Sequence, residues 1–443
     1  MPGSERFRRL VLEAQSGGRL PSLSTGVFRN GELAWAEAIG LADAEQRVEA
    51  TTDTQYAVAS ITKTFTAAAV LQLRDAGRLD LDDALSRHLP EAAHGTPALR
   101  RMLSHLSGLQ REPPGEIWET LVFPDEEELL RGLEEAEHVL PPHAAWHYSN
   151  LAYALLGHVV ARVSGVPFRN YVEERLLRPL GLARTTWGPT PPAALPYFVE
   201  PYSEAVRREP VLELGGKGGE SGLYSTLGDL ARWGAFLSDP DESVLAPSSV
   251  AEMHELQVMV EPDWTRGWGL GIELWRRGDR IFGGHTGGFP GFVSILVYAR
   301  SARTGAVLLT NSSRWPKLTA VGLDLLEAAL EELAPERERW TPEEPPPDEI
   351  VPLLGRWWSE GDEWIFSWRA GRLEARPVIA PPEREPSVFE PEGGDRFRTV
   401  SGAERGEVLR SVRDARGEVA RLYWATYPFT RAPEIFGARS EHF

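Results

Sequence analysis

A serine and a lysine three residues apart at the start of an apolar helical segment constrain this chain more than any other feature. Ser60 and Lys63 precede the apolar run 65–73, and on a helix this spacing places both side chains on one face, one turn apart. A serine hydroxyl needs a neighbouring base to act as a nucleophile, and a lysine in a dry pocket can supply one because desolvation lowers its pKa. The segment therefore predicts a core helix with a reactive hydroxyl in its first turn.

The choice of lysine at position 63 stands out against the rest of the chain. The sequence contains only Lys63, Lys217 and Lys317, and apart from histidine every other basic side chain is arginine. Arginine stays protonated in proteins, whereas lysine can give up its proton. A Ser-x-x-Lys pattern alone is common, and a solvated helix residue is the alternative interpretation, but the scarcity of lysine favours a chemical role.

Charge and composition narrow the range of functions. The 443 residues carry a formal net charge of −18, which repels nucleic acid and anionic membranes, so we expect neither as a partner. The absence of cysteine excludes disulfides, thiolate metal sites and cysteine nucleophiles. No stretch approaches the roughly 18 apolar residues of a membrane span, and the apolar run 10–14 is too short for a signal-peptide core. These features predict a cytoplasmic protein.

Changes in composition divide the chain into three parts. Residues 1–334 form the first predicted domain, and residues 335–349, rich in proline and glutamate, fit a linker. Residues 350–443 contain tryptophans that alternate with polar residues, followed by glycine-containing turn pairs. This pattern predicts a small antiparallel β domain.

Hydrophobic periodicity predicts helices and strands within the first domain. The hairpin signal Asn30-Gly31 lies between the predicted strands 24–28 and 32–39. Later strands are expected at 269–275, 280–284, 292–298 and 306–310, and helices at 5–15, 151–163, 226–237 and 319–333. The glycine-rich stretch 283–291 is expected to interrupt two of these strands, because glycine weakens a strand interior.

Three short motifs follow one another along the chain. They are Ser60-Ile61-Thr62-Lys63, Tyr148-Ser149-Asn150 and His285-Thr286-Gly287, the last followed by Gly288. In this order and spacing the chain resembles the superfamily of class C β-lactamases, penicillin-binding proteins, D-aminopeptidases and related esterases. The stretches 77–83, 102–109, 148–157 and 221–230 are also similar to that family, and the resemblance covers residues 5 to about 333.

The resemblance implies both a fold and a set of roles. It implies an α/β (α+β) fold, with an antiparallel sheet flanked by helices and a mostly helical subdomain. Ser60 matches the acylated nucleophile, Lys63 its proton acceptor, and Tyr148 a second general base, provided that Lys63 keeps its phenol partly deprotonated. Asn150 matches an amide that fixes Lys63 and contacts the substrate carbonyl. The backbone N–H groups of Ser60 and Gly288 match the oxyanion hole.

One position departs from the β-lactamase pattern. Where the β-lactamases and carboxypeptidases of this family carry lysine before Thr-Gly, this chain carries His285, followed by Thr286 and Gly287. A histidine is mostly neutral at pH 7, whereas a lysine offers a permanent cation to a substrate carboxylate. Esterase-like and aminopeptidase-like members also carry His-x-Gly. His105, His143 and His147 are interpreted as structural.

The carboxy-terminal domain has a resemblance of its own. Leu354-Gly355-Arg356-Trp357 is similar to the Gly-x-Trp sequence that opens lipocalin-like barrels, so a small all-β, barrel-like domain is expected. Some members of the hydrolase family carry such a domain, which implies assembly or shielding of the active site. A tryptophan-rich core without a ligand is the alternative, and exposed aromatics would suit a homo-oligomer interface.

The leading hypothesis is a serine hydrolase that forms an acyl-enzyme on Ser60 and cleaves small esters or peptide amides, as an esterase or a D-amino-acid peptidase. Its substrate would be a small molecule or a short peptide, and neither a metal ion nor an organic cofactor is implied. A β-lactamase or DD-carboxypeptidase is the alternative with the same chemistry. A binding or sensor protein that keeps the fold without turnover is the alternative from another class.

Overall fold

A computed structural model describes residues 4–141, 143–212, 218–333, 341–342, 344–381 and 384–434. The chain divides into two compact units, Met1–Ala334 and Pro335–Phe443. Within the predicted linker, residues 335–340 and 343 lie outside the described residues.

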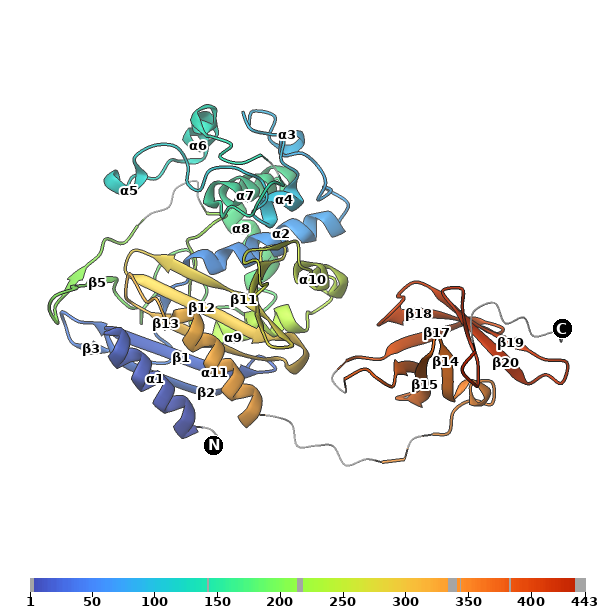
Figure 1. Ribbon diagram of the computed structural model, residues 1–443. Coiled ribbons are helices and arrows are strands. Elements are labelled where there is room, and N and C mark those ends of the chain that lie inside the picture. Colours follow the sequence, from blue (N-terminus) through green and yellow to red (C-terminus); the bar gives the residue numbers. More distant parts are fainter. Residues whose placement is uncertain are drawn as a thin grey trace. The chain divides into compact units, whose positions relative to one another are not determined.

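The centre of the first unit is a nine-stranded antiparallel sheet (Figure 1). Its strands in chain order are β1 Ser22–Arg29, β2 Glu32–Asp43, β3 Val48–Glu49, β8 Val258–Met259, β9 Arg266–Trp268, β10 Glu273–Arg277, β11 Arg280–Phe289, β12 Phe292–Ala299 and β13 Thr304–Thr310. Their spatial order is β3-β2-β1-β13-β12-β11-β10-β9-β8. The smaller sheets pair β4 Tyr56–Ala57 with β7 Tyr224–Ser225 and β5 Tyr197–Val199 with β6 Val206–Arg208.

Helices surround this sheet and form a separate helical part. They are α1 Ser4–Gly18, α2 Thr62–Asp75, α3 Leu85–His88, α4 Leu99–Leu103, α5 Ile117–Thr120, α6 Glu126–Gly132, α7 Asn150–Ser164, α8 Phe168–Val172, α9 Leu227–Ser238, α10 Pro247–Met253 and α11 Leu318–Glu332. A 3-10 turn, Ala59–Ile61, precedes α2. The predicted antiparallel sheet flanked by helices, with a helical subdomain, is confirmed.

The alternation of side chains along the strands explains how helices cover both faces of the sheet. On β13, Leu308 is buried in a cluster with Phe7 of α1 and Leu326 of α11, and these two helices lie on one face (Figure 1). The next residue, Leu309, belongs to the cluster on the opposite face, which includes Trp233 of α9. Successive strand side chains point to opposite faces, so each cluster takes every second residue.

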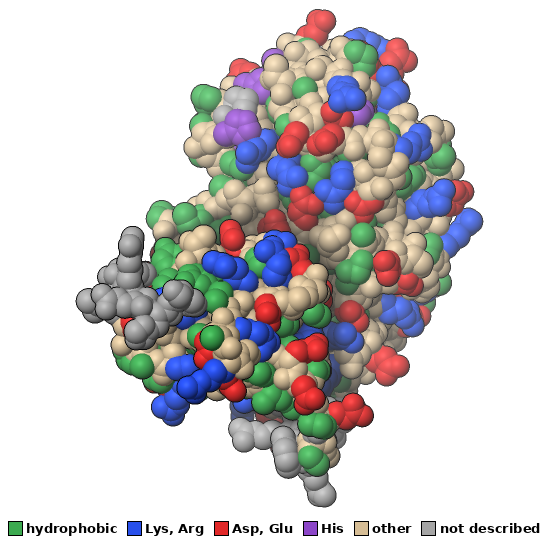
Figure 2. All heavy atoms as spheres, turned by 90° about the vertical axis from the view of Figure 1, so that its right-hand side faces the viewer, with side chains coloured by type: hydrophobic (Ala, Val, Ile, Leu, Met, Phe, Trp, Pro, Cys, Tyr) green, Lys and Arg blue, Asp and Glu red, His purple; other side chains and the backbone are tan. Residues whose placement is uncertain are grey.

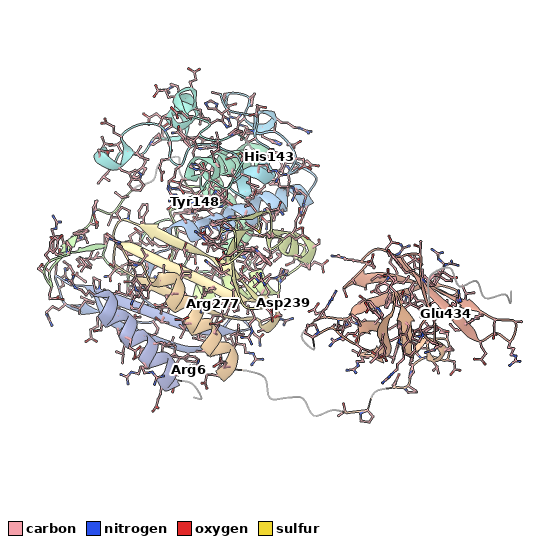
Figure 3. The ribbon with its side chains drawn as sticks, in the orientation of Figure 1. Arg6, His143, Tyr148, Asp239, Arg277 and Glu434 are labelled. Carbon is pink, nitrogen blue, oxygen red and sulfur yellow. The ribbon has the colours of Figure 1, made fainter. Side chains whose placement is uncertain are left out.

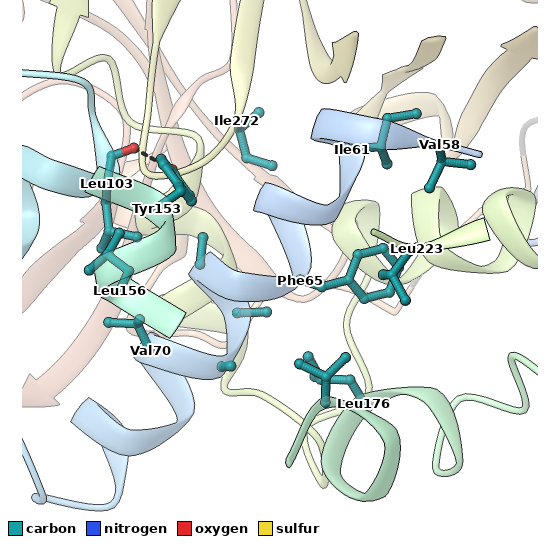
Figure 4. Packing of buried hydrophobic residues seen from close by; sticks show 14 of the residues in the cluster. Val58, Ile61, Phe65, Val70, Leu103, Tyr153, Leu156, Leu176, Leu223 and Ile272 are labelled. Carbon is teal, nitrogen blue, oxygen red and sulfur yellow. Dashed lines mark hydrogen bonds between the residues drawn. The ribbon is translucent and has the colours of Figure 1, made fainter. Parts of the chain in front are cut away.

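Helix α2 lies at the centre of the larger of these clusters (Figure 4). Its Phe65 stacks on Trp233 of α9 with 3.8 Å between ring centroids. On the other side it contacts α7, where the buried Tyr153 donates a hydrogen bond from its hydroxyl to Leu103 O at 2.6 Å. The helix that begins just after Ser60 is therefore held rigidly in the core.

Local sequence signals explain the ends of several elements. Asn30 and Gly31 both have positive φ, 50° and 83°, as the tight turn between β1 and β2 requires. Thr226 caps α9 by accepting a hydrogen bond from Asp229 N at 3.4 Å, and α7 ends at Gly165 with φ of 74°. The predicted hairpin and both helices are confirmed.

The glycine-rich stretch 283–291 does not interrupt the sheet as expected. β11 runs unbroken through most of it and pairs with β12 from Gly283 to Phe289. Glycine is needed at two positions of this stretch because backbone atoms of neighbouring segments leave no room for a Cβ atom. A Cβ atom on Gly284 would lie 2.0 Å from Leu296 O, and one on Gly287 would lie 2.2 Å from Val58 O.

The surface and the helix lengths bear on the expected partners. Acidic and basic side chains are interspersed across the face seen in Figure 2. In the described part of the chain, no single helix is long and apolar enough to cross a membrane. The pair α7 and Phe168–Leu177 reaches that length and composition together, but it bends by 78°, and α7 belongs to the buried core.

The second unit is a nearly closed barrel of eight antiparallel strands. They follow one another in space as in sequence: β14 Gly355–Ser359, β15 Asp362–Arg369, β16 Arg372–Pro377, β17 Ser387–Gly393, β18 Arg396–Ser401, β19 Val408–Arg413, β20 Val419–Trp424 and β21 Tyr427–Phe429. A bridge between Trp358 and Thr430 joins the two ends. Beside it, the guanidinium of Arg431 lies 3.7 Å from the ring of the fully buried Trp357. The expected all-β domain is confirmed.

Replacing Gly287 with alanine should destabilise the first unit. The added Cβ would meet Val58 O and Ser294 Oγ within 2.3 Å, and relieving such overpacking costs about 2 kcal/mol. The matched control is Gly288→Ala, because a Cβ there meets nothing within 4 Å. Urea unfolding monitored by tryptophan fluorescence should show a lower midpoint for Gly287→Ala alone. Equal midpoints for both variants would contradict the close approach.

Candidate active site

The segment that carries Ser60 is clamped between the sheet and the β4–β7 pair. Val58 N donates to Leu223 O at 2.9 Å, and Ser294 Oγ of β12 donates to Val58 O at 3.1 Å. Ala59 has φ of 47°, in the left-handed region that non-glycine residues rarely adopt. This sharp turn projects Ser60 from the end of the clamped segment into a cavity. Such strain is typical of functional positions.

Lys63 lies one turn after Ser60, as the spacing predicts. Its side chain is fully buried, and its Nζ donates hydrogen bonds to Ser60 Oγ at 3.1 Å and to Glu220 O at 2.8 Å. The same nitrogen lies 5.1 Å from the ring centre of Tyr148 and 5.5 Å from that of Tyr153. The lysine is thus held against the serine hydroxyl in a dry environment.

Tyr148 stands directly before α7, where the helical part meets the sheet (Figure 3). Burial raises the pKa of Tyr148 above its ordinary value, while a hydrogen bond with Ser60 opposes that shift. The phenol therefore keeps its proton at neutral pH in the absence of substrate. In this state Tyr148 is a hydrogen-bond donor, and it becomes a base only after giving up its proton.

His105 is a member of this site that the sequence did not identify. Its ring stacks on Tyr148, with 4.2 Å between centroids and 30° between planes, and its Nδ1 accepts a hydrogen bond from Ser149 N at 3.1 Å. Burial and the nearby charge of Lys63 hold the pKa of His105 well below its ordinary range. A signal was present, because the stretch 102–109 is one of those that resemble the family.

Asn150 begins α7 and lines the cavity beside Tyr148. Its Nδ2 donates to Glu112 Oε1 at 2.6 Å, and because a carboxylate only accepts hydrogen bonds, this contact fixes the orientation of the amide. The Oδ1 of Asn150 is buried and has no hydrogen-bond partner among the described residues. Asn150 therefore does not hold Lys63 in this state of the molecule.

His285 lies on β11 and is almost fully buried. Burial, followed by the positive charge of Lys63, lowers the pKa of His285 to about 3, so the ring is neutral at pH 7. Its Nδ1 donates to Thr286 O at 2.5 Å, and its Nε2 is buried without a hydrogen-bond partner in the described ranges. A neutral imidazole cannot anchor a carboxylate as a lysine would.

Arg266, whose charge also acts on His285, is paired with a carboxylate. Arg266 Nε donates to Glu273 Oε1 at 2.6 Å, and Thr286 Oγ1 donates to Glu273 Oε2 at 3.3 Å. Glu273 is buried, and this burial raises its pKa, against the effect of Arg266. The guanidinium of Arg266 also lies 5.4 Å and 5.9 Å from the rings of Trp146 and Trp268.

A cavity of about 510 Å³ connects these groups. It is lined by Ser60, Arg111, Glu112, Trp118, Trp146, Tyr148, Asn150, Glu220, Ser221, Arg266, Trp268, Thr286, Gly288 and Phe289. Gly288 has open space beside the strand, whereas Gly287 packs against the segment that carries Ser60. His285 does not line the cavity. A second cavity of about 480 Å³, with more apolar lining, shares Ser221 and Phe289 with the first.

The site thus combines residues that the motifs predict with others that they do not. Ser60, Tyr148, Asn150 and Gly288 meet in one cavity, with Lys63 directly behind the serine. The motifs gave no signal for the cavity residues Arg111, Glu112, Glu220 and Arg266. These come from loops and from a short strand, where spacing carries no information about tertiary contacts.

Comparisons with known proteins find similarity in both units of the chain. The family model described as Beta-lactamase matches residues 7–331, and a model described as a domain of unknown function (DUF7586) matches residues 346–431. Beta-lactamase-like protein 2 of Dictyostelium discoideum is 28% identical over 269 residues, 55% of this chain and 47% of that protein. The D-alanyl-D-alanine-carboxypeptidase/endopeptidase AmpH of Escherichia coli is 34% identical over 189 residues, 41% and 48% of the two chains. The chain spans about half the length of these curated relatives.

Solved structures extend the similarity to the fold. A D-stereospecific amidohydrolase from Streptomyces sp. is 26% identical with a TM-score of 0.63, over 73% of this chain and 98% of that one. The octameric penicillin-binding protein homologue from Pyrococcus abyssi has a TM-score of 0.65 over 96% of this chain and 99% of that one. At 22% identity the latter shows the fold alone.

The buried neutral histidines should make the first unit sensitive to acid. Because the pKa of His285 is lowered to about 3, the unfolded chain binds a proton below about pH 6.5 that the folded chain does not. Stability is therefore complete above that pH and falls on acidification, by up to about 1.4 kcal/mol per pH unit for this histidine. Urea unfolding of His285→Gln at pH 6.5, 5.5 and 4.5 should show a shallower decline than the unsubstituted protein.

The control for this pH series is His143→Gln, because His143 is exposed on a loop. It should reproduce the pH dependence of the unsubstituted protein. An unchanged slope in His285→Gln would show that His285 titrates near its ordinary pKa in the folded state.

Proposed function

The chain belongs to the beta-lactamase family, and proteins similar to it are described as a carboxypeptidase/endopeptidase and as an amidohydrolase; we propose that it hydrolyses small esters or peptide amides through an acyl-enzyme on Ser60. The observation that carries this proposal is the 3.1 Å hydrogen bond between Lys63 Nζ and Ser60 Oγ at the wall of a cavity. A buried amine in its neutral form is the base that a serine nucleophile needs.

The proposed reaction begins from the form of the site in which Lys63 has lost its proton, and its neutral amine takes the proton of Ser60 as Ser60 Oγ attacks the substrate carbonyl. The oxyanion that forms is stabilised by the backbone N–H groups of Ser60 and Gly288. Tyr148, which is protonated and close to both side chains, gives its proton to the leaving group and is reprotonated through Lys63. A water molecule then releases the acyl group by the reverse transfers.

The neutral charge of the His285 side chain favours simple esters and amides over penicillins as substrates. Its position lacks a permanent cation, since burial keeps the imidazole neutral. An esterase or a D-amino-acid peptidase is therefore our first candidate. The relative from Streptomyces is described as a D-stereospecific amidohydrolase, which supports the second of these.

One alternative with the same chemistry has support from a similar protein. AmpH of Escherichia coli is described as a carboxypeptidase and endopeptidase, which supports a DD-carboxypeptidase or a β-lactamase as the alternative function. A non-turnover sensor on the same fold is the alternative from another class, and it would be acylated once without releasing the acyl group.

We also propose a homo-oligomer that assembles through the barrel domain, since a protein of the same fold is described as octameric.

The lysine at position 63 should be required for activity. Lys63→Arg and Ser60→Ala should each lower the hydrolysis of p-nitrophenyl acetate by roughly a thousandfold or more, because arginine does not give up its proton. The matched control is Lys317→Arg, an exposed lysine before α11, which should keep full activity. Labelling by a fluorophosphonate probe should follow the same order. Equal labelling of Ser60→Ala would remove this serine from the mechanism.

Substrate turnover should separate the enzymatic alternatives from the sensor. We expect steady release of p-nitrophenol over many turnovers, together with much slower cleavage of the cephalosporin nitrocefin. A burst of one product per chain without later release would identify a non-turnover sensor. Nitrocefin cleavage as fast as ester cleavage would instead favour a β-lactamase.

A further inference from the structure

The cavity contains one arginine, Arg111, whose charge is balanced by no carboxylate of the described residues. Arg111 lines the cavity and is exposed to solvent. None of the ion pairs found in the described ranges includes it, and the contact of its guanidinium is with the ring of Tyr148, 4.9 Å from the centroid. An unpaired guanidinium beside an aromatic face is a good site for an anionic ligand.

The backbone of Arg111 is fixed close to the reacting groups. Its carbonyl accepts hydrogen bonds from Asn150 N at 2.7 Å and from Leu151 N at 3.1 Å, in the first turn of α7. Tyr148 immediately precedes this turn, so Arg111 and the proton donor are attached to the same structural element. The backbone from which the guanidinium extends is therefore fixed next to the segment that carries the phenol.

The other charged side chains in or behind the cavity are two carboxylates, Glu112 and Glu220, and two cations, Arg266 and Lys63. Glu112 accepts a hydrogen bond from Asn150 Nδ2 at 2.6 Å, and Arg266 is paired with Glu273. Lys63 is buried behind Ser60 and donates to it. Arg111 is thus the cation of the cavity that remains available to a ligand, within the part of the chain that the structure describes.

The place of Arg111 also indicates which part of a substrate it would contact. In the proposed reaction Tyr148 gives its proton to the leaving group, so the leaving group lies beside the phenol. The guanidinium that stacks on this phenol is therefore next to the leaving group rather than the acyl group.

We propose that Arg111 is a specificity-determining residue that binds an anionic group, first of all a carboxylate, carried by the leaving group of the substrate. This inference rests on the proposed function. The bond that breaks joins the acyl carbon to the leaving oxygen or nitrogen, and the bond that forms joins that carbon to Ser60 Oγ. The leaving atom takes a proton from Tyr148, and water later replaces Ser60 on the acyl carbon.

Two acetate esters with nearly identical leaving groups test this role. In 3-carboxyphenyl acetate the leaving phenol carries a carboxylate, and in 3-carbamoylphenyl acetate it carries a neutral amide of similar size. The unsubstituted protein should show kcat/KM at least tenfold higher for the carboxylate, mainly through KM, and this preference should weaken with added salt. Arg111→Met should reduce the preference roughly tenfold, and Arg111→Lys should retain part of it.

The matched control is Arg276→Met. The guanidinium of Arg276 also lies over an aromatic ring, 4.8 Å from that of Trp264, but Arg276 does not line the cavity. Its preference between the esters should equal that of the unsubstituted protein. An equal rate for both esters in the unsubstituted protein, or an unchanged preference in Arg111→Met, would overturn the role of Arg111.

Fluorophosphonate labelling separates this result from a failure of the proposed function. If Ser60 is labelled but the esters show no preference, the inference about Arg111 is wrong and the hydrolase remains. If Ser60 reacts neither with the probe nor with the esters, the proposed function itself is wrong. If Ser60 is labelled without turnover, protection from labelling by 3-hydroxybenzoate but not by 3-hydroxybenzamide would support Arg111, and equal protection would contradict it.

Discussion

The burial of the Lys63 amine is the constraint on which the rest of the site depends. Burying an amine is costly unless it forms hydrogen bonds, and here Ser60 Oγ and Glu220 O accept hydrogen bonds from it. Bringing the Glu220 carbonyl to α2 requires the chain to pass very close to α7, where a Cβ atom on Gly219 would lie 2.3 Å from Tyr153 O. One buried nitrogen thus determines how α2, α7 and the 219–223 segment fit together.

Much of this arrangement could be predicted from local patterns, and the remainder could not. The spacing of Ser60 and Lys63 places them one helical turn apart, and alternation or turn chemistry identifies most strands, as at Asn30-Gly31. By contrast, the stacking of His105 on Tyr148 joins segments that are distant in sequence. The unbroken course of β11 also could not be read locally, because Gly287 is required by contacts from Val58 rather than by a turn.

The distribution of charge in the site explains why a motif alone does not define the substrate. His285 occupies the first position of the family's Lys/His-x-Gly motif, but its side chain contributes no charge because burial lowers its pKa to about 3. A cation is nevertheless present on Arg111, which lines the cavity and comes from a loop that no motif covers. Charge and shape therefore come from different elements, so electrostatic preference can change while the strand next to the serine stays the same.

The solvent exposure of the lysines has a consequence for chemical modification of this protein. Reagents that acylate surface amines reach Lys317, which is exposed at the start of α11, whereas Lys63 is fully buried. Ser60, by contrast, opens into the cavity. A reagent that acylates amines can therefore modify Lys317 and leave Lys63 unmodified, whereas an activated ester that enters the cavity also reaches the hydroxyl of Ser60.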